Sequence, residues 1–281
     1  MTIILDGKAL ADKISTEIKM EIAQNGYTPS LAVIIVGNNP ASQLYVKNKN
    51  AKAKELGINS IVIELPENIS QFDLEKQIET LSLDKTIDAI LVQLPLPKHI
   101  NTQQIIEKIP PEKDVDGFHP YNIGRLISGF EPFAKACTPK GILRILKEYN
   151  LEIEGKNVVV VGRSNIVGKP VAIMLSNANA TVTLCHSKTQ NLKNITQNAD
   201  ILVCAVGKAK FITADFIKTG AIVIDVGINR DNDGKLCGDV DFENVKDKAS
   251  YITPVPKGIG PMTIAMLMQN SLDLYKISHK K

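Results

Sequence analysis

Cysteine and histidine are scarce in this 281-residue chain, and neither follows a metal-binding pattern. The four cysteines include no Cys-x-x-Cys pair, and the four histidines show no spacing typical of metal ligands. We therefore predict no metal site. We expect the cysteines to be buried free thiols, as is common in the reducing cytoplasm.

An excess of charge of one sign is also lacking, since 33 basic residues stand against 30 acidic ones. The net charge of +3 is too small and too evenly spread to indicate a nucleic acid or a membrane surface as partner. No apolar run approaches the length of a membrane span, and the N-terminus shows no signal or transit pattern. We expect a soluble cytoplasmic protein, long enough for two domains.

The chain alternates apolar runs with amphipathic segments, which favours α/β architecture with parallel sheets. The first part is expected to form strands near 31–36, 58–65 and 88–94 and helices near 7–24, 41–56 and 71–81. The second part is expected to form strands near 158–161, 180–185, 201–206 and 221–226, and a closing helix over 264–275. A domain boundary is expected in or after the turn-rich segment 109–120.

The clearest single pattern is a strand, a glycine turn and a helix start within 154–170. Four valines at 158–161 read as a buried strand that Gly162 ends, and Gly168 allows close backbone approach. Pro170 suits a first helical turn, whose free N–H groups and dipole favour an anion. Because the spacing Gly162-x-Ser164-x-x-x-Gly168 is not G-x-G-x-x-G, an ordinary βα turn remains the alternative.

The following strand, 180–185, lacks the acidic residue that commonly binds the ribose 2′-hydroxyl of NAD. Ser187 and Lys188 stand there instead, and Arg163 lies in the preceding glycine turn. These three side chains are suited to a 2′-phosphate, so the sequence favours NADP over NAD. The alternative for Ser187 and Lys188 is a solvated turn.

Three segments of the first part carry further candidate residues. Tyr45 and Lys49 are spaced i,i+4 on one helix face, where a partly desolvated lysine can transfer protons, although a merely solvated lysine face is the alternative. Gln93 lies at the carboxyl end of a strand, either in a ligand site or as a cap. In 114–117, one of the two aspartates, Asp114 or Asp116, could recognise a ring N–H and an amino group of a heterocycle. Two carboxylates are too few to argue for calcium, and an Asx-Gly turn is the alternative. Thr138 is expected to cap a helix that runs to about Tyr149.

These segments together resemble the bifunctional methylenetetrahydrofolate dehydrogenase/methenyltetrahydrofolate cyclohydrolase family. They occur in the family's order and cover nearly the whole chain. The matching segments are 45–49, 92–97, 111–118, 137–139, 162–170, 185–189, 225–229, 238–242 and 260–263.

The resemblance implies two α/β domains that flank a cleft, the second being Rossmann-like with a mainly parallel sheet. It assigns 1–120 together with the helix 262–281 to a folate-binding catalytic domain and 137–258 to an NADP-binding domain. It also implies a homodimer that forms through the NADP-binding domain. The implied reactions are NADP-linked oxidation of 5,10-methylenetetrahydrofolate and hydrolysis of the product to 10-formyltetrahydrofolate.

The resemblance also assigns roles to single residues. Lys49, placed by Tyr45, would be the general acid/base for the attacking water, Gln93 would support it, and Asp116 would hold the pterin ring. The implied cofactor-binding residues are Gly162, Arg163, Ser164, Ser187 and Ile228. The implied catalytic and substrate-binding residues are Tyr45, Lys49, Gln93, Asp116, Pro256, Gly260 and Pro261.

Two positions depart from the family pattern, and other functions remain open. Lys257 stands where the family usually has glycine, and Ala136 where it often has proline. The alternative function is a non-catalytic NADP-binding module or regulatory subunit. A dehydrogenase without cyclohydrolase activity is disfavoured by the intact Tyr45, Lys49 and Gln93, and a small-acid dehydrogenase by the lack of an arginine-centred carboxylate clamp.

Overall fold

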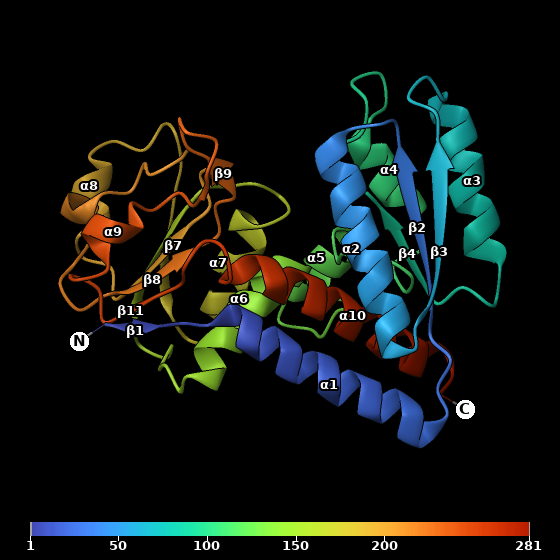
Figure 1. The fold of residues 1–281 in the computed structure, drawn as a ribbon, viewed down its shortest axis with the longest axis horizontal. Coiled ribbons are helices and arrows are strands. Elements are labelled where there is room, and N and C mark those ends of the chain that lie inside the picture. Colours follow the sequence, from blue (N-terminus) through green and yellow to red (C-terminus); the bar gives the residue numbers. More distant parts are fainter. Residues whose placement is uncertain (1, 281) are drawn as a thin grey trace. The chain divides into compact units, whose positions relative to one another are not determined.

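A computed structural model describes residues 2–280 and divides the chain into two compact units (Figure 1). Unit 1 comprises the N-terminal residues up to Asp12 and Ala136–Thr263, and unit 2 comprises Lys13–Lys135 and the residues from Ile264 onward. The two boundaries nearest the chain ends fall within long helices, α1 (Gly7–Asn25) and α10 (Ile259–Ser278). Each unit has a parallel sheet of its own.

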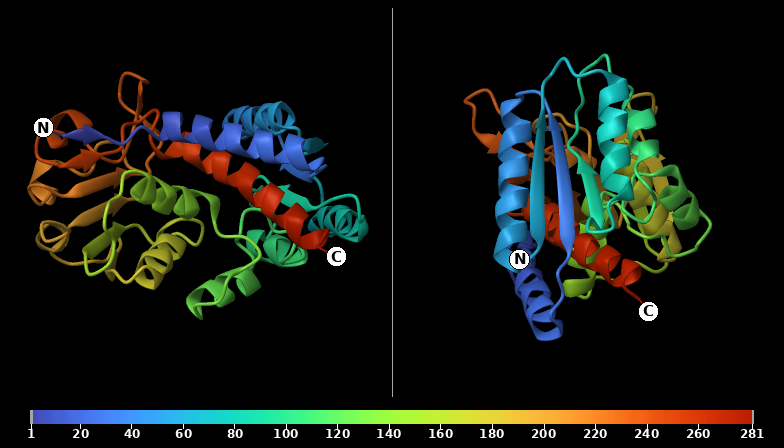
Figure 2. Two further views of the ribbon diagram at one scale, coloured as in Figure 1. Left: turned by 90° about the horizontal axis from the view of Figure 1, so that it is seen from below. Right: turned by 90° about the vertical axis from the view of Figure 1, so that its right-hand side faces the viewer.

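Unit 2 is built on three parallel strands in the order β3-β2-β4. Its strands are β2 (Ser30–Val36), β3 (Asn59–Leu65) and β4 (Ala89–Val92), and its helices include α2 (Pro40–Leu56), α3 (Gln71–Leu83), α4 (Thr102–Lys108) and α5 (Pro120–Ile127). Alternate residues of β2, among them Ile34, pack against Leu74 and Ile78 of α3. Helix α2 lies on the opposite face of the sheet, as right-handed crossovers require (Figure 2).

Unit 1 is built on six parallel strands in the order β1-β11-β8-β7-β5-β6. These strands are β1 (Ile3–Ile4), β5 (Asn157–Val161), β6 (Thr181–Cys185), β7 (Ile201–Cys204), β8 (Ile222–Asp225) and β11 (Tyr251–Ile252). Helices α6 (Cys137–Glu148) and α7 (Gly168–Asn177) cover one face, and α8 (Leu192–Thr196) and α9 (Phe242–Val245) the other (Figure 1). A short 3-10 helix, η1 (Ala214–Phe216), and a hairpin of β9 (Asn229–Arg230) and β10 (Leu236–Cys237) complete the unit.

The expected fold class is confirmed, and several local expectations need correction. Helix α10 begins at Ile259, five residues before the expected start, and α4 and α5 were not expected from the sequence. Thr138 does not cap α6: the N-cap is Ala136, and the Thr138 hydroxyl lies 2.8 Å from the Thr263 hydroxyl instead. Residues 2–12 group with the compact unit 1, in which β1 pairs with β11.

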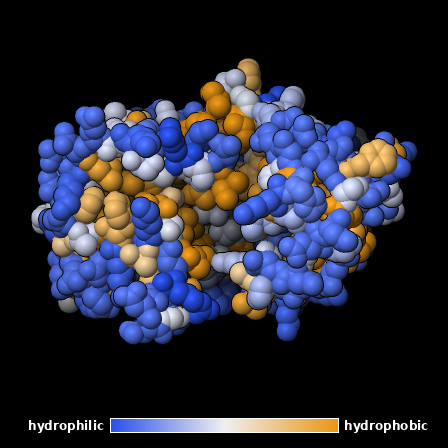
Figure 3. Space-filling view, turned by 90° about the horizontal axis from the view of Figure 1, so that it is seen from above, coloured by the Kyte–Doolittle hydropathy of each residue, from blue (hydrophilic) through white to orange (hydrophobic). Residues whose placement is uncertain are grey.

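The face drawn in Figure 3 carries many hydrophilic residues, with apolar patches between them. Within residues 2–280, no helix has both the length and the apolar content needed to cross a membrane. The four cysteines are buried and free, as expected.

The core of unit 2 can be tested at Ile34, which is fully buried in the central strand. Ile34→Ala leaves a cavity against α3, and we expect it to reduce the free energy of unfolding by about 2–5 kcal/mol. Ile61→Ala, on the edge strand β3 with 42% of the residue exposed, is the matched control and should cost less than about 1 kcal/mol. Urea unfolding curves provide the measurement, and equal losses for the two variants would contradict the assigned core.

Candidate functional site

In unit 2 the candidate residues lie at the carboxyl edge of the sheet, where the chain switches from β3 on one side of β2 to β4 on the other. Ligands of open parallel sheets bind at such switch points. Gln93 follows β4 directly, and its backbone amide donates to Ile34 at 2.8 Å. Its side-chain amide donates to the carbonyl of Leu94 at 2.6 Å, which leaves Oε1 to accept from Lys49 Nζ at 3.0 Å.

Helix α2 presents Tyr45 and Lys49 on adjacent turns. Asn39 caps the start of the helix, since its side chain accepts from the Ser42 amide at 3.1 Å, and Gly57 caps its end in a left-handed conformation. Val46 is buried beneath the helix, which fixes its rotation. Partial burial raises the pKa of Tyr45, so its phenol is protonated and able to donate at neutral pH.

The loop that carries Asp116 is fixed by its neighbour Asp114. Asp114 pairs with Ile90 in an isolated parallel bridge and is buried. Its carboxylate accepts from the His119 amide at 2.8 Å and from Asn122 Nδ2 at 3.0 Å. Burial raises the pKa of Asp114 despite these hydrogen bonds.

The surroundings of Asp116 shift the pKa of its carboxyl. Burial raises its pKa to about 6, the positive charge of Lys49 lowers it, and the charge of Asp114 raises it. The structure thus brings Asp116, Lys49 and Gln93 together at one edge. A carboxyl that titrates near neutrality beside an amine and an amide is suited to binding a polar heterocycle and to moving protons.

In unit 1 the glycine turn after β5 is closely packed. Gly162 has φ +125°, and a Cβ there would lie 2.1 Å from the carbonyl oxygen of Ala205, which follows β7. A Cβ on Gly168 would lie 1.9 Å from the carbonyl oxygen of Gly162. Both positions therefore require glycine, and the turn sits at the switch point between β5 and β7.

The amides at the start of α7 are not all free, which corrects one expectation. The Ser164 hydroxyl accepts from the amides of Val167 and Gly168 at 3.2 and 3.3 Å. Ser164 therefore satisfies two of the donors that were expected to face an anion. The exposed side chain of Ser164 remains at the edge of the turn.

The neighbouring strand end brings the phosphate candidates close to the turn. Val161 of β5 is in register with Cys185 of β6, so Arg163 and Ser187 follow adjacent parallel strands. Arg163 and Ser187 are exposed, and the side chain of Arg163 has no hydrogen bond or ion pair to any of residues 2–280. A glycine cradle with an uncommitted guanidinium beside it fits a phosphorylated nucleotide such as NADP.

The remaining candidates of unit 1 lie in two segments. Ile228 follows β8 and is 51% exposed, and its Cδ1 would lie 3.8 Å from a Cβ on Gly260. Gly260 and Pro261 lie in the first turn of α10, while Pro256 is exposed after the cis Val255–Pro256 bond. Lys257, next to it, is exposed and has φ +82°, a conformation that favours glycine.

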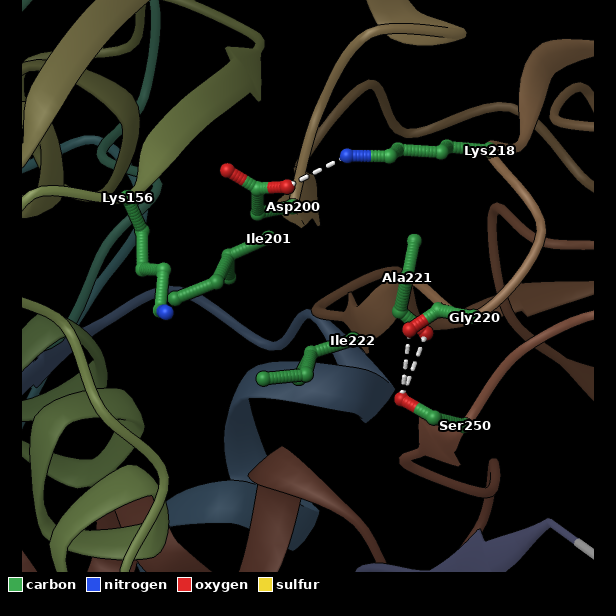
Figure 4. A pocket seen from close by; sticks show the side chains of 8 residues that line it. All are labelled: Lys156, Asp200, Ile201, Lys218, Gly220, Ala221, Ile222 and Ser250. Atoms are coloured by element: carbon green, nitrogen blue, oxygen red, sulfur yellow. Dashed lines mark hydrogen bonds and ion pairs between the residues drawn. The ribbon is translucent and has the colours of Figure 1, made fainter.

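A separate pocket of about 220 Å³ lies at the opposite, amino-terminal edge of the same sheet (Figure 4). Its polar groups are already paired: Lys218 Nζ lies 2.6 Å from the Asp200 carboxylate, and the Ser250 hydroxyl donates to the carbonyl of Gly220 at 2.7 Å. The pocket includes Ile201 and Ile222, the first residues of β7 and β8. It is therefore on the edge away from the strand ends where ligands of such sheets bind.

Sequence reasoning gave no role to three buried side chains that shape these edges. Asp114 was weighed only as a turn or cation ligand, and Asp225 and Asp239 only as parts of matching segments. Burial raises the pKa of Asp225 to about 7, although hydrogen bonds from the amides of Val240, Asp239 and Gly227 act to lower it. Each of these aspartates lies within three residues of a glycine, a weak signal for a carboxylate that accepts backbone amides.

Comparison with known proteins gives two family models in tandem. Residues 5–116 match the tetrahydrofolate dehydrogenase/cyclohydrolase catalytic domain, and residues 136–279 match the NAD(P)-binding domain of the same name. The bifunctional protein FolD of Bacillus anthracis is 56% identical over 98% of this chain and 97% of its own length.

Solved structures agree with these matches. The bifunctional FolD dehydrogenase/cyclohydrolase of Campylobacter jejuni is 51% identical, with a TM-score of 0.96 over 99% of both chains. The methylenetetrahydrofolate dehydrogenase-cyclohydrolase of Trypanosoma brucei, solved with NADP and an inhibitor, is 39% identical with a TM-score of 0.95 over 100% of this chain and 99% of its own.

The raised pKa of Asp116 predicts a pH-dependent stability. Its pKa is 3.8 when solvated and about 6 in the fold, so between these values the folded protein binds more protons and loses stability as the pH rises. Asp116→Asn cannot ionise, and we expect it to unfold at a higher temperature than wild type at about pH 8. The difference should vanish below about pH 4. Thermal unfolding across this range checks it, and a pH-independent difference would contradict it.

Proposed function

The chain belongs to the tetrahydrofolate dehydrogenase/cyclohydrolase family, and on that premise we propose that it catalyses both reactions of one-carbon folates. It oxidises 5,10-methylenetetrahydrofolate to the 5,10-methenyl form with NADP and hydrolyses that product to 10-formyltetrahydrofolate. The observation that carries the proposal is the arrangement of Lys49, Gln93 and Asp116 at one sheet edge, with Lys49 Nζ held 3.0 Å from Gln93 Oε1.

The first reaction needs positioning more than acid–base chemistry. NADP supplies the hydride acceptor when it is bound. The reacting carbon of the substrate lies between two nitrogens, and a nitrogen lone pair can expel hydride without a strong base. The task of unit 2 is therefore to orient the folate, with the Asp116 carboxyl as hydrogen-bond partner of the pterin ring.

The second reaction adds water to a cationic carbon, and here a base is required. We assign the proton of that water to Lys49 Nζ, the amine that lies at this edge beside Gln93 Oε1 and the Asp116 carboxyl. Gln93 holds the amine in place by its hydrogen bond, and its own amide is fixed on the Leu94 carbonyl. Tyr45, one turn away on α2, supplies a neutral phenol beside this site.

For the cofactor we propose that Gly162, Ser164 and Ile228 line the nucleotide and that Arg163 and Ser187 bind its 2′-phosphate. Two observations support this. The register of β5 with β6 brings Arg163 and Ser187 to neighbouring strand ends, and the exposed side chain of Arg163 has no partner among residues 2–280. We further propose that Pro256, Gly260 and Pro261 contribute to substrate binding.

Assembly and compartment are proposals as well. A homodimer through unit 1 is supported by the position of β6 at the edge of its sheet, where a partner can dock. A cytoplasmic location is supported by the four buried free cysteines. The alternative of a non-catalytic NADP-binding module has no specific support in the structure.

Lys49 is tested by separating the two reactions. Lys49→Ala removes the base, and we expect hydrolysis of supplied methenyltetrahydrofolate to fall by about 100-fold or more. The NADP-linked oxidation should fall less. Lys47→Ala, on the exposed face of the same helix, is the control and should hydrolyse at the wild-type rate. An equal loss of both reactions in Lys49→Ala would refute the assigned role.

Arg163 is tested by comparing the two nicotinamide cofactors. Arg163→Ala loses a charge-assisted contact to the 2′-phosphate, so its Kd for NADP should rise by about tenfold while its Kd for NAD stays within about twofold. Lys169→Ala is the control, because Lys169 is exposed at the same turn and bonds Asn165. Equal weakening of both cofactors would place the 2′-phosphate elsewhere.

A further inference from the structure

Two buried carboxylates lie beneath the carboxyl edge of the unit 1 sheet. Asp225 ends β8 with 2% of the residue exposed, and Asp239 follows β10 with none exposed. Neither can reach a ligand from this depth. Nearly all of the hydrogen bonds that these two side chains accept come from backbone amides of the loops at this edge. Burying a carboxylate costs free energy, and these amides offset that cost while the carboxylates hold the loops in place.

Asp239 gathers three consecutive amides of the loop after β7. Its Oδ2 accepts from the amides of Val206 and Gly207, and its Oδ1 accepts from the Lys208 amide at 2.9 Å. The same Oδ1 accepts from Asn229 Nδ2 at 2.9 Å. Successive amides around one anion form a nest, and here the anion is the chain's own carboxylate.

Asp225 holds Asp239 in place. Its Oδ1 accepts from the amides of Gly227 and Asp239, both at 2.9 Å, and its Oδ2 accepts from the Val240 amide at 2.9 Å. A Cβ on Gly238 would lie 1.8 Å from Asp225 Oδ2, and a Cβ on Gly227 would lie 2.5 Å from Asp239 Oδ1. The two glycines are therefore required by the carboxylates packed against them.

Both loops held in this way adjoin cofactor candidates. The segment 206–208 continues from Ala205, whose carbonyl oxygen would be 2.1 Å from a Cβ on Gly162. Ile228 lies between Gly227 and Asn229, each of which donates to one of the two carboxylates. A shift of either aspartate would displace a wall of the nucleotide site.

We propose that Asp239, held by Asp225, is a positioning residue for NADP. Together the two carboxylates fix segments 206–208 and 227–229 at the cofactor edge of unit 1. The identity of the ligand rests on the proposed function. Asp239 acts through the loops and does not contact the cofactor itself.

Asp239→Asn tests this with little change of volume. One carboxylate oxygen becomes an NH₂ group, so two of the four donors lose their acceptor whichever way the amide is turned. We expect the Kd for NADP, measured by calorimetric titration, to rise by about tenfold. Hydrolysis of supplied methenyltetrahydrofolate, assayed without NADP, should stay within about twofold of wild type. Asp233→Asn, exposed between β9 and β10, is the control and should change neither quantity.

Asn229→Ala provides a milder second variant, since it removes one donor and leaves the carboxylate. Its Kd for NADP should rise by about threefold with hydrolysis unchanged. The proposal is overturned if Asp239→Asn binds NADP as wild type does, or if it loses hydrolysis and NADP binding in equal proportion. If Asp239→Asn does not fold, an unchanged Kd in Asn229→Ala overturns it. Wild type that converts no folate would refute the proposed function, while the NADP titrations would still decide the role of Asp239.

Discussion

The close approach of three backbone segments at the end of β5 is the constraint on which unit 1 depends. Gly168 lies against the carbonyl of Gly162, and Gly162 lies against the carbonyl of Ala205, with no room for a Cβ at either glycine. This contact joins the start of α7 to the loop after β7 at the switch point of the sheet. A nucleotide can then approach the backbone at the point where α7 begins, and the buried Asp239 fixes the other side of the same contact.

Unit 2 uses the same parallel-sheet geometry with different chemistry. At its switch point, β4 is followed by Gln93, which has a side-chain amide, rather than by a glycine turn. Helix α2 contributes Lys49, whose Nζ donates to Gln93 Oε1. The buried Asp114 fixes the loop that carries Asp116, whose carboxyl remains beside the positive charge of Lys49. In each unit, a buried aspartate accepts hydrogen bonds from backbone amides close to the candidate reactive or binding groups.

The sequence was sufficient for the parts of the fold with strong periodic patterns. The four valines of β5, the apolar run of β2 and helix α2 lie within about two residues of their predicted bounds. The two-residue strands β1 and β11 have no period to detect, because pairing with distant segments alone makes them strands. Strands β9 and β10 are equally short and pair with each other as a local hairpin. Thr138 resembled a cap but pairs with Thr263, which is 125 positions away in the chain. The roles of Asp225 and Asp239 depend on similarly non-local contacts, so their sequence context alone did not reveal them.

The central claim is that one chain carries both the oxidation and the hydrolysis of a one-carbon folate. The most direct measurement supplies purified wild-type protein with 5,10-methylenetetrahydrofolate and NADP and follows NADPH and 10-formyltetrahydrofolate together. The account predicts that both products appear and that, once the methenyl intermediate has been consumed, they are equal in amount. Binding of NADP without formation of either product would contradict it, as would NADPH formation with hydrolysis no faster than in the absence of protein.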